Sequence, residues 1–335
     1  MKHFLSIIFL LGTTVLFYSC KKEYSLEGGI VTGGGNTNSG TSEGTLGGTP
    51  GTCANVIVNG TYGQGIALND STINVSVEVK ITKAGTYTIG TDTINGVHFL
   101  KSGTFTDSGI RRVTLRAYGT PSNAGLFTYT VKYKSSSCTF EVEVFATAIT
   151  NGTDYFPTTA NSYWTYNDDI GADTFRTTST GNTKDFAGNT YSVFVDTPGL
   201  DSSFYRKGSG LYYEYFQSLA IPGATNLPSG EYIFLKDNVP VNSQWESAEF
   251  PIAISGITTK LKLKFTITQK NTSKLIGSKI YANVIVIKRE LLAFALLGYQ
   301  TVDTVELWYA KGIGRINDKG VTVPYTDDII SYKVF

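Results

Sequence analysis

The chain has 335 residues, of which 41% are apolar, so it is long enough to bury the cores of two ordinary domains. Only 16% of its residues are charged, and 28 Lys and Arg balance 27 Asp and Glu. A chain this close to neutral lacks the broad positive field that attracts nucleic acid, which excludes nucleic acid as a partner. Abundant Tyr, Phe and Gly, with a single Met, favour strands and tight turns over helices.

Residues 1–19 have the pattern of an export signal. Lys2 and His3 precede an apolar stretch that runs from Phe4 to Tyr18. About 15 apolar residues are too few to cross a bilayer core of about 30 Å comfortably, but they match the hydrophobic region of a signal peptide. We therefore expect this segment to be removed and the rest of the chain to lie outside the cytoplasm.

The end of the signal resembles that of a lipoprotein, in which a small residue precedes a cysteine that becomes acylated. Ser19 precedes Cys20, and the bulky Phe17 and Tyr18 before them are typical of the relaxed signals of Bacteroidota lipoproteins. The resemblance implies an outer-membrane lipoprotein of the cell envelope, on its periplasmic or surface face, held to the membrane by the lipid on Cys20. The alternative is an ordinary secretory signal followed by an unrelated cysteine.

Residues 20–52 are predicted to form a flexible linker behind the lipidated cysteine. Gly, Thr, Ser and Asn dominate from Gly28 to Thr52, and no apolar periodicity is present. Such a composition buries too little apolar surface to offset the entropy of ordering the chain.

Two further cysteines, Cys53 and Cys138, predict one disulfide, because an even number of cysteines in an exported chain favours pairing. Closing so long a loop stabilises the folded state by about 4–5 kcal/mol when the effect is treated as chain entropy. The alternative is a pair of buried free thiols.

Residues 53–147 alternate apolar and polar side chains, as strands with one buried and one solvated face do. The longest run has apolar residues at every second position: Ile73, Val75, Val77, Val79 and Ile81. Turn signals recur every eight to twelve residues, which predicts a β-sandwich. The run from Gly85 to Ile89, with Asn95-Gly96-Val97 and Ser102 to Phe105, resembles the immunoglobulin-like modules of Bacteroidota surface proteins. This resemblance implies a spacer or adhesive module.

Residues 155–335 predict a second all-β domain, an antiparallel meander that forms a barrel or half-barrel. The expected strands are 163–166, 190–196, 203–207, 211–217, 232–235, 260–268, 280–288, 302–309 and 330–335, with hairpin turns at 188–189, 208–210 and 319–320. Tyr155-Phe156-Pro157, Tyr163–Tyr166 and Trp308–Gly314 resemble exported β domains of the same bacteria, which are uncharacterised. The predicted fold class is therefore all-β throughout.

The sequence predicts no catalytic residue, no metal ligand and no cofactor. His98 is the only histidine after the signal, which leaves no histidine pair for a metal and little basis for Ser-His-Asp or Cys-His catalysis. The carboxylate pairs Asp168-Asp169 and Asp327-Asp328 occur in turn-like contexts, and neighbours on a strand would point to opposite faces. Neither pair therefore predicts the two facing carboxylates of a glycosidase.

The aromatic run from Tyr212 to Phe216 is the best candidate for ligand binding. On a strand, Tyr213 and Tyr215 share one face and Tyr212 and Phe216 share the other, so one face is a candidate surface for stacking sugar rings. The alternative is that both faces are structural.

Two more segments are candidates for surface contacts. Lys260, Lys262 and Lys264 alternate with apolar residues, as on the charged outer face of a strand, with contact to anionic lipid headgroups as the alternative. The apolar run from Leu291 to Leu297 is expected to be buried, or else to form a hydrophobic lip for a ligand.

These observations predict a non-enzymatic, lipid-anchored protein of the cell envelope with a binding, structural or adhesive role. One alternative is a glycan-binding accessory protein that uses the aromatic run. Another is a carrier of a lipid or other apolar ligand in a half-barrel, with Leu291 to Leu297 at its mouth. The expected partners are accordingly a membrane, a glycan, an apolar ligand or another envelope protein.

Overall fold

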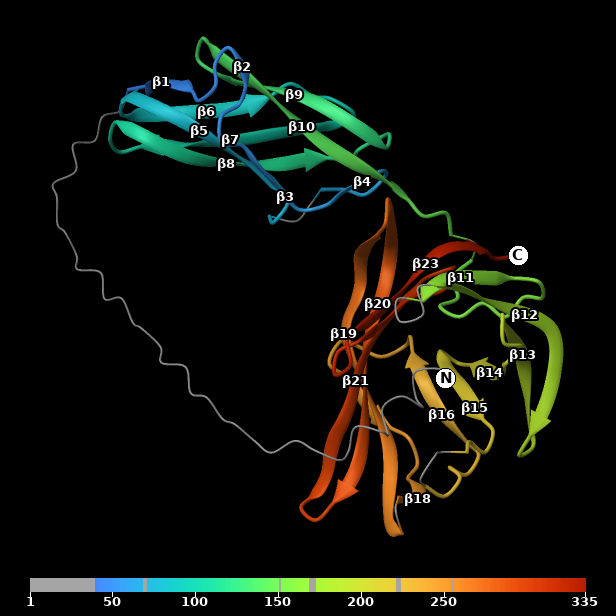
Figure 1. Ribbon diagram of the computed structural model, residues 1–335. Helices are drawn as coiled ribbons and strands as arrows, with labels where there is room; N and C mark the ends of the chain where they lie inside the picture. Colours follow the sequence, from blue (N-terminus) through green and yellow to red (C-terminus); the bar gives the residue numbers. More distant parts are fainter. Residues whose placement is uncertain (1–39, 69–70, 151, 169–172, 221–223, 255) are drawn as a thin grey trace. The chain divides into compact units, whose positions relative to one another are not determined.

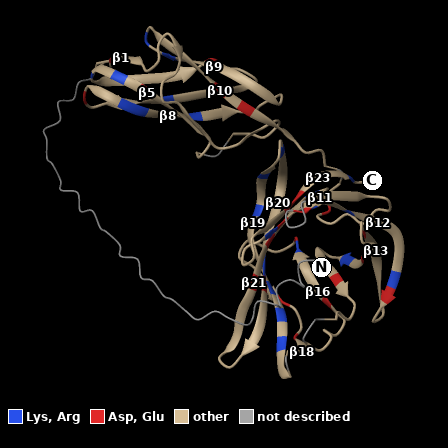
Figure 2. Ribbon diagram, in the orientation of Figure 1, with Lys and Arg blue, Asp and Glu red and all other residues tan. Residues whose placement is uncertain are grey.

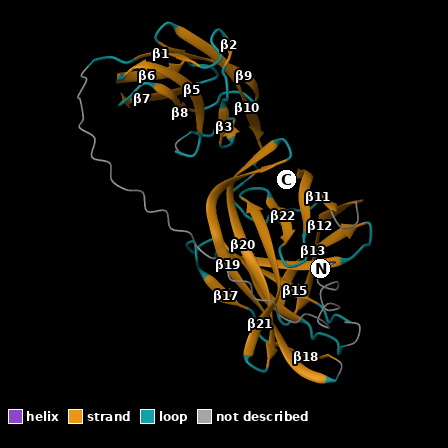
Figure 3. Ribbon diagram, turned by 60° about the vertical axis from the view of Figure 1, so that its left-hand side comes forward, coloured by secondary structure: helices purple, strands orange, loops and turns teal. Residues whose placement is uncertain are grey.

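The computed structural model describes residues 40–68, 71–150, 152–168, 173–220, 224–254 and 256–335 (Figure 1). Their regular elements are all strands (Figure 3), so the predicted all-β class is confirmed. No membrane-crossing helix is present in these ranges. The described chain divides into two compact units, residues 40–147 with 278–280 and residues 148–277 with 281–335. The predicted signal peptide, Cys20 and most of the predicted linker lie outside the described residues.

The N-terminal unit is built from short antiparallel strands. They are β1 (Glu43–Leu46), β2 (Gly51–Thr52), β3 (Ile57–Asn59), β4 (Tyr62–Gly63), β5 (Asn74–Lys83), β6 (Gly85–Thr91), β7 (Val97–Phe105), β8 (Gly109–Gly119), β9 (Gly125–Tyr133) and β10 (Ser136–Thr147). Strand β5 pairs with β8, β8 with β7 and β7 with β6, whereas β9 and β10 form a hairpin. The short β2 and β4 run parallel to β10.

The core of this unit consists of the apolar side chains that the predicted period-two alternation places on one face of each strand. Val75, Val77 and Val79 of β5 are fully buried, and the residues that alternate with them are more polar. The two groups of strands are joined where β6 pairs with β9. The ring of Phe99 on β7 packs edge-on against Tyr129 of β9 at 5.1 Å between centroids, in the core of the resulting β-sandwich.

The predicted disulfide is confirmed. Cys53, just after β2, is bonded to Cys138 on β10, and both residues are buried. The bond links positions 85 residues apart, so it closes almost the whole sandwich into one loop. Most of its stabilising effect is therefore expected to come from restricting the unfolded chain.

Replacing both cysteines by serine is expected to lower the free energy of unfolding of the sandwich by about 4–5 kcal/mol. Urea denaturation of the variant and the wild type measures this difference. The wild type in reducing buffer serves as the control and should unfold at nearly the same urea concentration as the variant. A variant as stable as the oxidised wild type would contradict the loop-closure argument.

The sandwich begins earlier than the predicted linker boundary at residue 52. Strand β1 lies within the Gly- and Thr-rich segment and pairs with the edge of β5, with Leu46 opposite Val79. Leu46 is buried, and the buried Ser42 hydroxyl lies 2.7 Å from the Tyr133 hydroxyl. The glycines permit this pairing because they let the two backbones approach closely. Composition alone therefore placed the end of the linker too late.

Because β1 lies so close to β5, we expect a substitution at Gly44 to be far more destabilising than one at Gly40. A Cβ atom at Gly44 would lie 2.3 Å from the Lys80 carbonyl oxygen, whereas a Cβ atom at Gly40 would have nothing within 4 Å. Gly44→Val should therefore displace β1 and lower the free energy of unfolding by about 1–3 kcal/mol, while the control Gly40→Val should change little. Hydrogen exchange of the β1 amides and urea denaturation measure both effects. Equal exchange in the two variants would count against the pairing.

The C-terminal unit is one strongly curved sheet. Its strands are β11 (Tyr163–Asp168), β12 (Asp173–Phe186), β13 (Asn189–Thr197), β14 (Ser202–Gly208), β15 (Leu211–Phe216), β16 (Gly230–Lys236), β17 (Gln244–Glu246), β18 (Phe250–Ile254), β19 (Ile257–Ile276), β20 (Lys279–Ala295), β21 (Gly298–Ala310), β22 (Gly314–Gly320) and β23 (Tyr325–Lys333). Neighbours pair in chain order from β11 to β16 and from β19 to β23, and β23 joins the two series by pairing with β11. Both β17 and β18 pair with β19.

This sheet curls but does not close into a barrel. Strands β11 to β16 face β19 to β21 across its concave side (Figure 1). Residues of both series pack together there: the Phe234 ring of β16 lies 5.8 Å from the Tyr309 ring of β21, and the Tyr232 ring of β16 stacks 5.9 Å from the Phe265 ring of β19. The concave side is therefore an interior.

The apolar run from Leu291 to Leu297 is buried at its start and exposed at its end, which corrects the prediction that it is buried. Leu291 and Leu292 lie in β20 and are buried. Leu296 and Leu297 lie in the turn between β20 and β21 and are fully exposed. The run spans a strand end and its hairpin turn, which is why its two ends differ in exposure.

Candidate ligand-binding cavity

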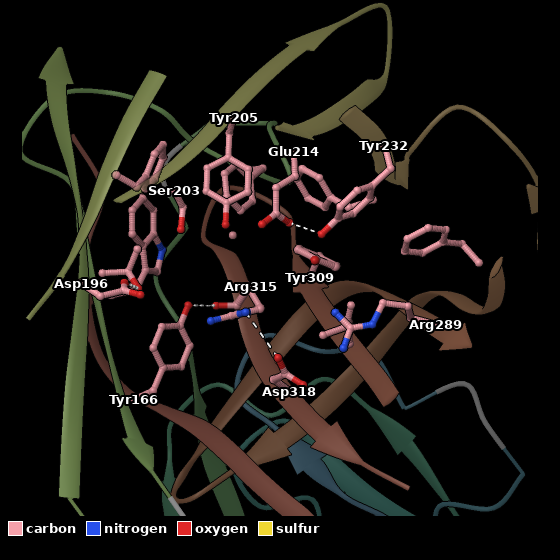
Figure 4. Close-up of a pocket in the computed structure, with 18 of the residues that line it drawn as sticks. Tyr166, Asp196, Ser203, Tyr205, Glu214, Tyr232, Arg289, Tyr309, Arg315 and Asp318 are labelled. Carbon is pink, nitrogen blue, oxygen red and sulfur yellow. Dashed lines mark hydrogen bonds and ion pairs between the residues drawn. The ribbon is translucent and has the colours of Figure 1, made fainter. Parts of the chain in front are cut away.

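A cavity of about 120 Å³ lies inside the curved sheet of the C-terminal unit (Figure 4). Its walls come from both series of strands, because every second residue of a strand points to the same face. Strand β13 contributes Phe194 and Asp196, and β14 contributes Ser203 and Tyr205. For comparison, an engineered cavity of about 150 Å³ accommodates benzene. The volume therefore suits a small molecule.

One wall of the cavity is a cluster of aromatic rings. Phe156, from the segment that precedes β11, lies 4.7 Å from the Tyr205 ring and 5.0 Å from the Phe234 ring. Phe194 meets Tyr205 edge-on at 5.1 Å. These contacts fix the wall, since aromatic pairs at such distances hold one another in defined orientations.

The opposite side carries a polar network centred on Arg315. An Arg315 Nη1 atom lies 3.4 Å from Asp318 Oδ2, and the Tyr325 hydroxyl donates to Asp318 Oδ1 at 2.9 Å. The Tyr166 hydroxyl donates to the Arg315 carbonyl oxygen at 2.8 Å, and the guanidinium lies 5.0 Å from the centre of the Tyr166 ring. Arg315 and Asp318 therefore form an ion pair within the protein.

The other two carboxylates of the cavity also have donors. The Tyr232 hydroxyl donates to Glu214 Oε2 at 2.6 Å, and the Thr177 hydroxyl donates to Asp196 Oδ1 at 2.6 Å. Burial raises the pKa of Tyr232, and that of Tyr166 to about 12, so both hydroxyls are protonated at neutral pH and can donate.

Arg289, on β20, differs from the other charged residues of the cavity. Its side chain lines the cavity, but no described residue hydrogen-bonds to its guanidinium or forms an ion pair with it (Figure 4). Burial acts to lower the pKa of Arg289, yet the Asp318 carboxylate and nearby acidic and phenolic groups raise it overall, so the group stays cationic. The cavity thus contains a guanidinium whose N–H groups donate no hydrogen bond to the described residues.

An apolar pocket of about 50 Å³ adjoins the cavity. Tyr232 and Arg289 line both spaces. The rest of the lining is mainly apolar, with Gln217 and Lys262 as its polar residues; the apolar residues are Phe216, Leu219, Leu227, Phe250, Leu261, Leu263 and Leu291. The interior therefore has a polar part and an apolar part that meet at one arginine.

The predicted aromatic run is divided between the two faces of β15. Tyr212 and Phe216 are buried on the interior side, and Phe216 lines the apolar pocket. Tyr213 lies under the Arg206 guanidinium at 3.7 Å, and Tyr215 stacks on Phe186 at 4.2 Å. The two outward rings are therefore half-buried against neighbours.

Sequence reasoning missed Glu214 and Arg289, although a signal was present. Ile285, Ile287, Arg289 and Leu291 stand at every second position of β20 and so share one face of the strand. Arg289 therefore lies on a face that is otherwise apolar. Glu214 likewise stands between Tyr212 and Phe216. A lone charge in the apolar phase of a strand indicates a polar interior.

The remaining candidates lie elsewhere. His98, on β7, stacks on Tyr118 at 5.5 Å. Asp327 and Asp328 lie within β23 and not in a turn, which corrects that expectation; Asp327 is buried and Asp328 accepts a hydrogen bond from Asn317. Within the described ranges no three His, Cys, Asp or Glu residues gather as a metal site would require.

Lys260 and Lys262 of the lysine stripe on β19 form ion pairs. Lys260 contacts Glu249 at 2.6 Å, and Lys262 contacts Glu246 at 2.7 Å. Basic and acidic segments are interspersed over the strands of both units (Figure 2). The stripe therefore offers little free positive charge for lipid headgroups.

Comparison with known proteins adds no further constraint. No protein-family model, curated protein or solved structure matches this chain.

Asp303, on β21, predicts a pH-dependent stability. It is buried, its Oδ1 atom has no hydrogen-bond partner in the described protein, and burial raises its pKa although Arg289 acts in the opposite direction. A pKa that is higher in the folded state means that stability is greatest below the unfolded value of about 3.9 and is lost as the pH rises through the folded value. Asp303→Asn should therefore be more stable than the wild type at pH 7 and no more stable at pH 3.5.

Urea denaturation at the two pH values measures this difference. Asp201→Asn, at an exposed turn position in the same unit, is the matched control and should show no such pH dependence. If the wild type and Asp303→Asn differ equally at both pH values, ionisation of Asp303 does not affect stability.

Proposed function

We propose that the C-terminal unit is a non-enzymatic binding domain that holds a small, partly apolar molecule inside its curved sheet. The observation that carries this proposal is the junction of the polar cavity with the apolar pocket at Arg289 and Tyr232. A space with one polar and one mainly apolar end matches the usual build of small-molecule sites. This is the apolar-ligand alternative among the functions that the sequence predicts.

The rest of the chain is proposed to place this domain in the cell envelope. The apolar signal and Cys20 support a lipoprotein held to the outer membrane by its lipid, and the disulfide supports an oxidising compartment. The sandwich, which is closed by that disulfide, would serve as a spacer or adhesive module between the anchor and the binding domain.

Two other functions receive less support. Glycan binding by the aromatic run requires exposed, coplanar rings, whereas Tyr213 and Tyr215 are packed against Arg206 and Phe186. Hydrolysis requires carboxylates that are free to exchange protons with a substrate, whereas Glu214 and Asp196 each accept a short hydrogen bond from a neighbouring hydroxyl.

Binding of hexan-1-ol, an uncharged molecule of suitable size, tests the proposal. Isothermal titration calorimetry should show binding to the wild type, and Leu263→Trp should weaken it at least tenfold because the larger ring fills the apolar pocket. Leu275→Trp, at a partly exposed position of the same strand, is the matched control and should bind as the wild type does.

Thermal unfolding must confirm that both variants are folded before the affinities are compared. The proposal is wrong if neither hexan-1-ol nor a six-carbon acid or amine binds to the wild type. It is also wrong if Leu263→Trp, folded as the wild type is, binds these molecules equally well.

A further inference from the structure

We propose that the cavity recognises a carboxylate, and that the Arg289 guanidinium is its principal contact. This inference rests on the proposed function, because it specifies which small molecule the interior of the C-terminal unit selects. The ligand class is a monocarboxylate with a short aliphatic chain or a single ring.

Arg289 is the cavity's unpaired cation among the described residues. Arg315 is already engaged by Asp318, but Arg289 has no hydrogen-bond or ion-pair partner there. A guanidinium withdrawn from bulk water and left without acceptors is unfavourable, so a site that retains one favours an anionic guest. Its planar fork of donors matches the two oxygens of a carboxylate.

The acidic residues around Arg289 do not take the place of such a guest. Asp318 is bound to Arg315 and Tyr325, and Glu214 accepts from Tyr232. Asp303 is buried on the adjacent strand β21 but makes no ion pair with Arg289. Asp318 and Asp303 raise the pKa of Arg289 and so favour its charged form, while its donors stay available.

A second donor faces the same cavity. The Tyr309 hydroxyl of β21 lines it and has no hydrogen-bond partner among the described residues. Burial raises the pKa of Tyr309, so its hydroxyl is protonated and can donate to an anionic oxygen. Arg289 and Tyr309 both reach into this space (Figure 4).

The apolar pocket determines which chemical group the ligand can carry beside its carboxylate. Leu291, two residues after Arg289 on the same face of β20, lines that pocket with Leu261 and Leu263 of β19. A ligand whose carboxylate contacts Arg289 can therefore place its apolar part directly against these leucines. Lys262, the other cation that lines this pocket, is already paired with Glu246 at 2.7 Å, so a second carboxylate at that end would lack a free cation and dicarboxylates fit poorly.

The volumes set the size of the ligand. The cavity and pocket measure about 120 and 50 Å³. A space slightly larger than one that accommodates benzene suits about six carbon atoms in addition to the carboxylate. Longer acyl chains would have to displace protein side chains.

Calorimetric titration of the full chain with hexanoate, hexan-1-ol and hexylamine tests this inference. The wild type should bind hexanoate at least tenfold more tightly than hexan-1-ol. Arg289→Met should remove this preference by weakening hexanoate at least tenfold, with hexan-1-ol little changed, whereas Arg289→Lys should keep part of it. Lys288→Met, on the opposite face of the same strand, is the matched control and should keep the full preference.

The outcomes separate this inference from the proposed function. Equal affinity of the wild type for hexanoate and hexan-1-ol would overturn carboxylate recognition and leave the binding domain intact. Preference for hexylamine would overturn it as well, since the acidic residues would then dominate. Absence of binding by all three would overturn both proposals. If Arg289→Met does not fold, the comparison of hexanoate with hexan-1-ol in the wild type and in Arg289→Lys still decides.

Discussion

Each strand of the C-terminal unit sends every second side chain to the concave face, and the curl of the sheet turns that face into an interior. A charged side chain that points to the concave face is therefore withdrawn from bulk water. Arg289, Glu214 and Asp318 occupy such positions, and each must be satisfied within the cavity. The aromatic wall and the polar network are both consequences of this geometry.

The arginines of the interior differ in whether they are paired with a carboxylate of the protein. Arg315 and Asp318 neutralise each other, with Tyr166 and Tyr325 as additional hydrogen-bond donors. A paired buried charge can be nearly neutral in free energy, whereas an unpaired one is costly. Arg289 has no partner among the described residues, and a bound anion would compensate its charge.

Sequence patterns captured the features that depend on local order. The β5 alternation and the Cys53–Cys138 disulfide were predictable because period two and an even cysteine count are visible along the chain. Strand β12, Asp173–Phe186, was missed because its side chains are mostly polar and its ladder is provided by β11 and β13. The cavity was missed for a different reason: Arg289 and Tyr205 line the same space only after the sheet has curled, and no single strand encodes that curl.

The bond between Cys53 and Cys138 also determines how the sandwich would respond to mechanical force. A pull applied to the two ends of the chain enters near β1 and leaves along β10. Because the bond joins positions 85 residues apart, tension passes through the sulfur atoms and bypasses β3 to β9. Stretching can peel away β1 and β2, but it cannot extend the enclosed loop, so the oxidised module should behave as a nearly inextensible spacer.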